Sequence, residues 1–98
     1  MKTKELLTYL NTNNLVYLLR LKQLELSDLK FKQVFNYYDG ELSGVVEVAN
    51  KDYYYTFVDE DRGNNRIYVV LDTNNYNFNS WQELFNRDLD IIGYFKNW

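Results

Sequence analysis

Three adjacent carboxylates, Asp59, Glu60 and Asp61, are the residues whose types and spacing most readily suggest chemistry. Several oxygens that converge on one point can bind Mg²⁺ or Ca²⁺. The spacing from Asp59 to Asn65 matches a calcium-binding loop only in part, because Gly63 is misplaced and no glutamate closes the loop. Adjacent like charges repel each other, so we expect these side chains to project into water from the tip of a turn.

The same carboxylates also support an interpretation in which they imitate the backbone of a nucleic acid. Carboxylates along a strand and its turn can enter a basic groove of a partner. Asp39 and Glu41 lie upstream and could extend such a stripe. The alternative is the solvated face of an ordinary sheet. The acidic candidates for partner binding are Glu47, Asp52, Asp59, Glu60 and Asp61.

Consecutive tyrosines form the second candidate feature. Tyr53, Tyr54 and Tyr55 must divide between the two faces of a strand, because side chains alternate. We expect Tyr53 and Tyr55 to face the core together with Ile67, Val69 and Leu71. Tyr54 and Tyr68 are then left outside, where tyrosine is a favourable anchor for a protein partner.

The composition excludes several classes of chemistry. The chain has no cysteine and no histidine, which removes thiolate nucleophiles, the usual general base and most zinc or copper sites. Its four glycines match no phosphate-binding motif. We therefore expect no enzymatic activity, no cofactor and no metal site.

Five runs of apolar and β-branched residues are typical of strands. Alternation in Arg66–Leu71 and Tyr53–Val58 predicts a hairpin, with the turn at Gly63-Asn64-Asn65. Leu15–Leu26 also fits a helix, although we favour a strand. The predicted strands are Leu15–Leu26, Lys30–Tyr38, Glu41–Val48, Tyr53–Val58 and Arg66–Leu71.

Helices are predicted at both ends of the chain. Thr3 is the expected N-cap of a helix over Lys4–Thr12. Ser80 and Glu83 match a capping box, and the apolar spacing that follows predicts a helix as far as Gly93. The predicted fold is one α+β domain over residues 1–98. It has an antiparallel sheet of about five strands, with the N-terminal and C-terminal helices packed on one face.

Charge is distributed unevenly along the chain. Residues 1–34 carry six basic and three acidic side chains, whereas residues 35–98 carry five basic and eleven acidic ones. A negative field over the larger part disfavours nucleic acid as a partner and favours a basic protein surface. No apolar run is long enough to span a bilayer, so we expect a cytoplasmic protein without a membrane partner.

In size, in the lack of Cys, His and Pro, and in the acidic segment from Asp39 to Asp90, the chain resembles small phage-encoded anti-CRISPR proteins and other inhibitors of host defence. No alignable motif carries this resemblance. It implies a non-catalytic inhibitor that binds a basic surface of a host nucleic-acid enzyme, such as a CRISPR effector nuclease. The acidic residues above would supply the charge, and Tyr54 and Tyr68 the anchors.

Two other functions remain open from the sequence. An aromatic surface can hold together a structural or regulatory homo-oligomer. Alternatively, the basic N-terminal segment can bind nucleic acid. Its basic residues are Lys2, Lys4, Arg20, Lys22, Lys30 and Lys32.

Overall fold

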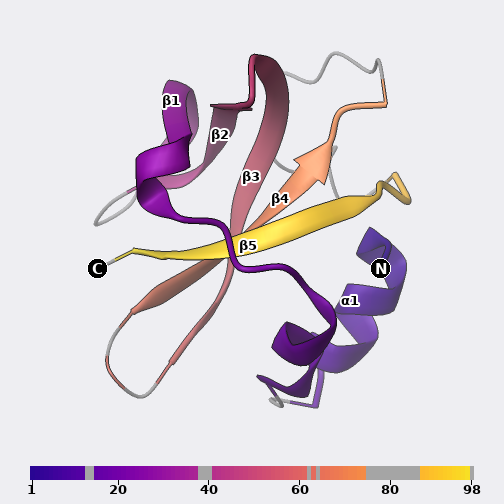
Figure 1. Cartoon of the computed structure of the whole chain (residues 1–98). Helices are drawn as coiled ribbons and strands as arrows, with labels where there is room; N and C mark the ends of the chain where they lie inside the picture. The colour runs from indigo at the N-terminus through magenta and orange to yellow at the C-terminus, as the bar shows by residue number, and fades with distance from the viewer. Residues whose placement is uncertain (13–14, 38–40, 62, 64, 75–86, 98) are drawn as a thin grey trace.

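The centre of the molecule is β4 (Arg66–Asp72), a run of β-branched and aromatic residues that is buried on both faces. The structure is a computed structural model that describes residues 1–12, 15–37, 41–61, 63, 65–74 and 87–97 (Figure 1). Within these ranges, five strands form one antiparallel sheet in the order β1-β2-β3-β4-β5. Besides β4, the strands of this sheet are β1 (Leu29–Tyr37), β2 (Glu41–Val48), β3 (Lys51–Glu60) and β5 (Ile91–Asn97).

Four of the five predicted strands are confirmed, as β1 to β4. The turn between β2 and β3 places Ala49 at φ 51° and Asn50 at φ 67°. Positive φ at both central residues gives a turn whose twist matches that of the flanking strands. The predicted turn at Asp39 and Gly40 lies outside the described residues.

The predicted strand over Leu15–Leu26 is wrong. Leu15–Arg20 forms a 3₁₀ helix, η1, and Leu26–Asp28 forms a second one, η2. Leu15, Leu18 and Leu21 pack against the core at intervals of three residues, which is the period of a 3₁₀ helix. Only a short piece around Gln23 is extended, where it forms a parallel bridge with Tyr94.

The N-terminal helix, α1 (Thr3–Leu10), is confirmed, but the predicted role of Thr3 is wrong. Thr3 is the first helical residue and is completely buried. Its hydroxyl donates a hydrogen bond to the carbonyl oxygen of Leu89, and it accepts one from the Leu89 N–H. Thr3 therefore attaches α1 to the segment before β5 instead of capping the helix.

The predicted C-terminal helix is also wrong where the structure describes that region. Its proposed start at Ser80 lies outside the described residues, but residues 91–97 form β5 beside β4. Gly93 does not end a helix. A Cβ atom at this position would lie 2.6 Å from the Lys22 carbonyl oxygen, so glycine allows the Lys22–Leu24 segment to approach β5. The Tyr94 N–H donates to that oxygen, and the Leu24 N–H donates to the Tyr94 carbonyl.

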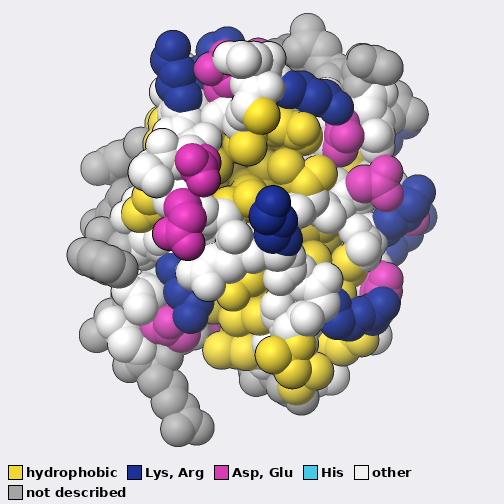
Figure 2. Space-filling view, in the orientation of Figure 1, with side chains coloured by type: hydrophobic (Ala, Val, Ile, Leu, Met, Phe, Trp, Pro, Cys, Tyr) yellow, Lys and Arg dark blue, Asp and Glu magenta, His cyan; other side chains and the backbone are white. Residues whose placement is uncertain are grey.

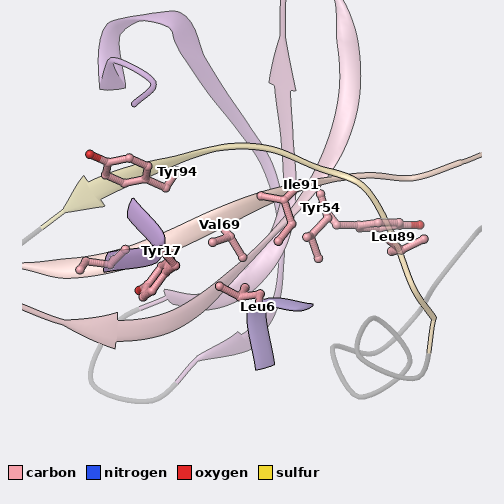
Figure 3. Close-up of a cluster of buried hydrophobic side chains, with 9 residues drawn as sticks. Leu6, Tyr17, Tyr54, Val69, Leu89, Ile91 and Tyr94 are labelled. Carbon is pink, nitrogen blue, oxygen red and sulfur yellow. The ribbon is translucent and has the colours of Figure 1, made fainter. Parts of the chain in front are cut away.

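Side chains on the two faces of β4 join two hydrophobic clusters. Figure 3 shows the first, in which Leu6 of α1 lies close to Val69 of β4. The buried members of this outer cluster are Leu6, Tyr17, Tyr54, Ile67, Val69, Leu71, Leu89, Ile91 and Tyr94. The opposite face carries the inner cluster, whose buried members are Val46, Tyr55, Tyr68, Val70 and Phe95.

The faces of β3 are the reverse of those predicted relative to β4. Tyr54 pairs with Leu71, and Tyr55 pairs with Val70. Tyr54 therefore faces the outer cluster, and Tyr55 faces the inner one. Alternation within each strand was predicted correctly, but alternation alone does not determine how two strands align.

Candidate protein-binding surface on the first strand

Aromatic rings from four strands form a continuous group on the inner face of the sheet. Tyr68 and Phe95 stack with their ring centroids 5.0 Å apart, and Phe31 meets Tyr55 edge to face at 5.3 Å. Such ring pairs stabilise a fold by about 0.5–1.5 kcal/mol beyond the area that they bury. Phe57 adds a further edge contact with Tyr68. The rings therefore form a closely packed aromatic layer on the inner face.

The exposed edge of this aromatic layer lies on β1. Phe31 is 38% exposed and Val34 is 41% exposed. Phe31 pairs with Val46, and Val34 pairs with Gly44, which in turn faces Tyr55. Phe31 and Val34 therefore lie on the inner face, next to the buried rings. Large apolar side chains that remain exposed beside a well-packed cluster are candidates for contact with a partner.

Half-buried hydrophobic side chains extend the same surface. Figure 2 shows hydrophobic side chains in the upper middle and in the lower part of the visible face, with charged side chains between and around them. The partly buried residues that pack against the inner cluster are Leu24, Leu29, Val48, Tyr53, Phe57 and Ile92. An apolar centre with a polar rim is the usual arrangement of a protein-binding surface.

Charges near this surface largely offset one another. Lys51 pairs with Asp72 at 3.3 Å, and its Nζ lies 5.1 Å from the centre of the Tyr53 ring. Lys32 contacts Asp52 at 3.1 Å and Glu47 at 3.8 Å. The hydrogen bond to Asp52, together with the charge of that carboxylate, raises the pKa of Lys32. The rim therefore has no strong excess of either sign.

The predicted acidic residues do not form one patch. Glu47 and Asp52 face each other at the start of β3, whereas Asp59 and Glu60 lie at its other end. Residues 52 and 60 are separated by up to about 26 Å, since a strand rises about 3.3 Å per residue. Lys32 pairs with both members of the first group. Asp39 and the side chain of Glu41 lie outside what the structure describes.

Asp61 has a structural role in the β3–β4 turn. Its carboxylate accepts hydrogen bonds from the backbone N–H groups of Gly63 and Asn65, and it pairs with Lys96 at 3.2 Å. Burial acts to raise its pKa, but the hydrogen bonds from Asn65, Lys96 and Gly63 outweigh burial and lower the pKa. The Asp61 side chain is only 17% exposed, so it is poorly placed to bind a partner.

The expectation that Tyr54 and Tyr68 lie outside the core is wrong. Tyr54 is 4% exposed and Tyr68 is 3% exposed. The register of β3 and β4 turns Tyr54 toward the outer cluster and Tyr68 toward the inner cluster, so both rings are buried. Neither ring is available as a surface anchor in this fold.

Much of the basic N-terminal charge is paired within the chain. Arg20 pairs with Glu5, and Lys2 lies 4.0 Å from Asp90. Lys32 is engaged as described above. Among the described residues, Lys30 of β1 is in no ion pair, although it pairs in register with Glu47. The predicted basic surface for nucleic acid is therefore reduced to scattered lysines.

The described part of the chain contains no cluster of side chains suited to a metal ion. No three acidic, histidine or cysteine side chains lie close enough there to hold a metal ion. An open groove of about 400 Å³ lies beside β5, but it contains none of the predicted site residues. Its lining residues are Gln23, Leu24, Glu25, Leu26, Ser27, Asn65 and Lys96. No helix in the described residues is long and apolar enough to cross a membrane.

Comparisons with protein-family models, with curated proteins and with solved structures find no match.

Phe31 and Val34 were not among the residues proposed from the sequence. No clear signal for them is present in the sequence, because the predicted strand over Leu15–Leu26 precedes Lys30–Tyr38 and left its place in the sheet open. The edge position of β1 becomes visible only in the sheet order, where β1 pairs with β2 alone among the described residues.

Proposed function

We propose that this chain is a non-catalytic protein-binding domain whose partner docks on the β1 surface, defined as Lys30–Val34. The observation that carries the proposal is the exposure of Phe31 and Val34 at the margin of a rigid aromatic cluster. Covering them would remove apolar surface from water at about 25 cal/mol per Å². The nearly balanced charges of the rim favour a protein over a nucleic acid, because phosphate binding requires an excess of positive charge.

The test compares captured proteins for matched variants of the tagged chain. Wild type, a Val34→Arg variant and a Leu19→Ser variant are each incubated with nuclease-treated bacterial lysate. Val34 is 41% exposed and is not a member of the inner cluster, so its replacement should leave that cluster intact. Leu19 is 86% exposed and lies on η1, away from β1, so it provides the control.

We expect Val34→Arg to lose a protein that wild type and Leu19→Ser retain in equal amounts. Circular dichroism and thermal unfolding must show that Val34→Arg remains folded. Identical sets of captured proteins for all three chains would exclude β1 as the docking surface.

Inhibition of a basic nucleic-acid enzyme through the acidic residues remains a prediction. The separation of the carboxylates into two groups, one of them paired with Lys32, gives it less support than a single acidic patch would. Glu60→Lys is the cleanest variant for testing it, because Glu60 is exposed whereas Asp61 holds the turn together. Salt-independent binding to such an enzyme, or binding that Glu60→Lys leaves unchanged, would count against this function.

A further inference from the structure

Among the described residues, β1 lies at an edge of the sheet, and the rings that Phe31 contacts cover its inner face only in part. In this part of the chain, β1 forms a ladder with β2 alone. Five consecutive residues, Lys30–Val34, are all exposed, whereas most side chains of the central strands β3 and β4 are buried or half-buried. An edge strand also presents unpaired backbone N–H and C=O groups on its outer side, which can pair with another chain. β1 therefore offers both a backbone template and exposed side chains.

The edge has features that discourage pairing with a second copy of itself. Lys30 and Lys32 are both exposed on it. Exposed lysines on an edge strand are a common way in which proteins prevent edge-to-edge aggregation. Two β1 strands paired in parallel and in register would also bring Lys30 and Lys32 of both copies together, and like charges across a sheet destabilise it.

The same lysines suit a partner of opposite charge. Lys32 is occupied by Asp52 and Glu47, so it contributes little to binding another carboxylate. Lys30 is in no ion pair of the described part of the chain. Phe31 and Val34 lie on the inner face, and Lys30 lies on the other. An added strand that alternates apolar and acidic side chains would match both faces.

We infer that the edge of β1 binds an extended, acidic segment of a partner protein, which adds to the sheet as a further strand. The apolar side chains of that segment lie over Phe31 and Val34, and one of its carboxylates pairs with Lys30. The inference rests on the proposed function and deepens it, because it names both the mode of docking and the chemistry of the partner.

Synthetic peptides of the length of β1, about nine residues, are the probes for the test. One alternates valine with glutamate, a second valine with lysine and a third valine with serine. Binding to the full chain is measured by fluorescence anisotropy at neutral pH. Amide hydrogen exchange identifies the protected strand. We expect the glutamate peptide to bind most tightly and to protect β1 amides.

Charge reversal tests the assignment of Lys30. Lys30→Glu should weaken binding of the glutamate peptide roughly fivefold, because it removes one exposed ion pair and adds a repulsion of similar size. Lys4→Glu changes the net charge equally, on an exposed residue of α1, and should leave the affinity nearly unchanged. Equal weakening by both variants would show a general charge effect and overturn the assignment of Lys30.

Three outcomes of the binding tests would overturn the inference of an added acidic strand. The first is equal binding of all three peptides, and the second is protection of amides outside β1. The third is tighter binding of an oligothymidylate than of any peptide, which would indicate a nucleic-acid partner. Formation of a dimer that protects β1 amides without any peptide would assign the edge to a second copy.

The two proposals can fail separately. If Val34→Arg abolishes capture of a protein but the glutamate peptide leaves β1 amides unprotected, the protein-binding function stands and strand addition is wrong. If Val34→Arg changes neither capture nor peptide binding, β1 is not the docking surface and both proposals fail.

Discussion

Phe31 and Phe95 meet edge to face with ring centroids 5.6 Å apart, although they belong to the first and last strands of the sheet order. A flat sheet of this order would keep its edge strands far apart, since neighbouring strands are about 4.8 Å from each other. The sheet therefore curls until its two edges share one cluster of rings. The inner cluster is consequently the interior of the curl, and β1 lies at its margin.

Phe95 helps to hold the curled sheet together, so its replacement should lower the stability of the fold. Phe95 is 1% exposed and contacts the rings of Phe31, Tyr55 and Tyr68. Phe95→Leu keeps an apolar side chain but removes the ring contacts, so we expect a loss of about 1–2 kcal/mol in the free energy of unfolding. Urea denaturation measures this loss. Leu19→Ala is the exposed control, expected within about 0.5 kcal/mol of wild type. Equal effects of the two variants would contradict the role of the rings.

Local patterns predicted the meander well, because each of its strands carries its own signal. Alternation and β-branched residues mark β4, and turn residues mark both ends of β3. Faces and register were harder to predict. Both faces of β3 are buried, so neither the tyrosines nor their neighbours distinguish inside from outside. The irregularity between Phe57 and Asp59 shifts the pairing further.

The ends of the chain were mispredicted because tertiary contacts determine their structure. Residues 91–97 carry an apolar spacing that a helix can also use, but their partner is β4, far away in the sequence. The number of strands was nevertheless right, since β5 takes the place of the predicted strand over Leu15–Leu26. The candidate surface was missed because sequence alone does not show that Tyr68 is buried while Phe31 remains open.

The carboxylates of Asp61 and Asp72 should make the free energy of unfolding depend on pH. The pKa of Asp72 is lowered from its ordinary value of 3.8, first by a hydrogen bond from the Asn74 N–H and also by Lys51, and that of Asp61 is lowered as well. The folded protein therefore binds these protons less tightly than the unfolded chain does. The resulting stability is present above about pH 4 and is lost as the pH falls through the lowered values.

We expect the double variant Asp61→Asn, Asp72→Asn to show a weaker decline in stability between neutral pH and about pH 3 than wild type does. Urea denaturation at each pH provides the measurement. Glu60→Gln, which changes an exposed carboxylate at the same turn as Asp61, is the control and should keep the wild-type slope. Parallel pH profiles for wild type and the double variant would show that these carboxylates do not cause the decline.

Tyr17 carries a buried hydroxyl that has no hydrogen-bond partner in the described part of the protein. Burial, followed by the nearby charge of Asp59, raises the pKa of this phenol well above its ordinary value. An unsatisfied buried polar group costs about 1–3 kcal/mol, so Tyr17→Phe should stabilise the fold by about 1 kcal/mol. Thermal and urea unfolding test this. Tyr94→Phe removes a hydroxyl that donates to Gln23 and should instead be neutral or slightly destabilising. Destabilisation by Tyr17→Phe would reveal a partner for its hydroxyl.

The lack of a side chain at Gly44 allows β1 to lie close to β2. A Cβ atom at Gly44 would lie 1.9 Å from the backbone oxygen of Gln33 and 2.9 Å from the Tyr55 hydroxyl. Gly44→Ala must therefore push β1 away from β2, and we expect a loss of about 2–3 kcal/mol, as for other overpacked sites. Faster amide exchange in β1 than in β4 would locate the damage at this edge. At Gly63 an added Cβ would meet its nearest atom at 3.4 Å, so Gly63→Ala serves as a control and should change stability by less than about 0.5 kcal/mol.

Because strand addition needs β1 in place, Gly44→Ala should also weaken binding of the valine–glutamate peptide, whereas Gly63→Ala should not. If Gly44→Ala unfolds no more easily than Gly63→Ala, the close approach of β1 to β2 is wrong.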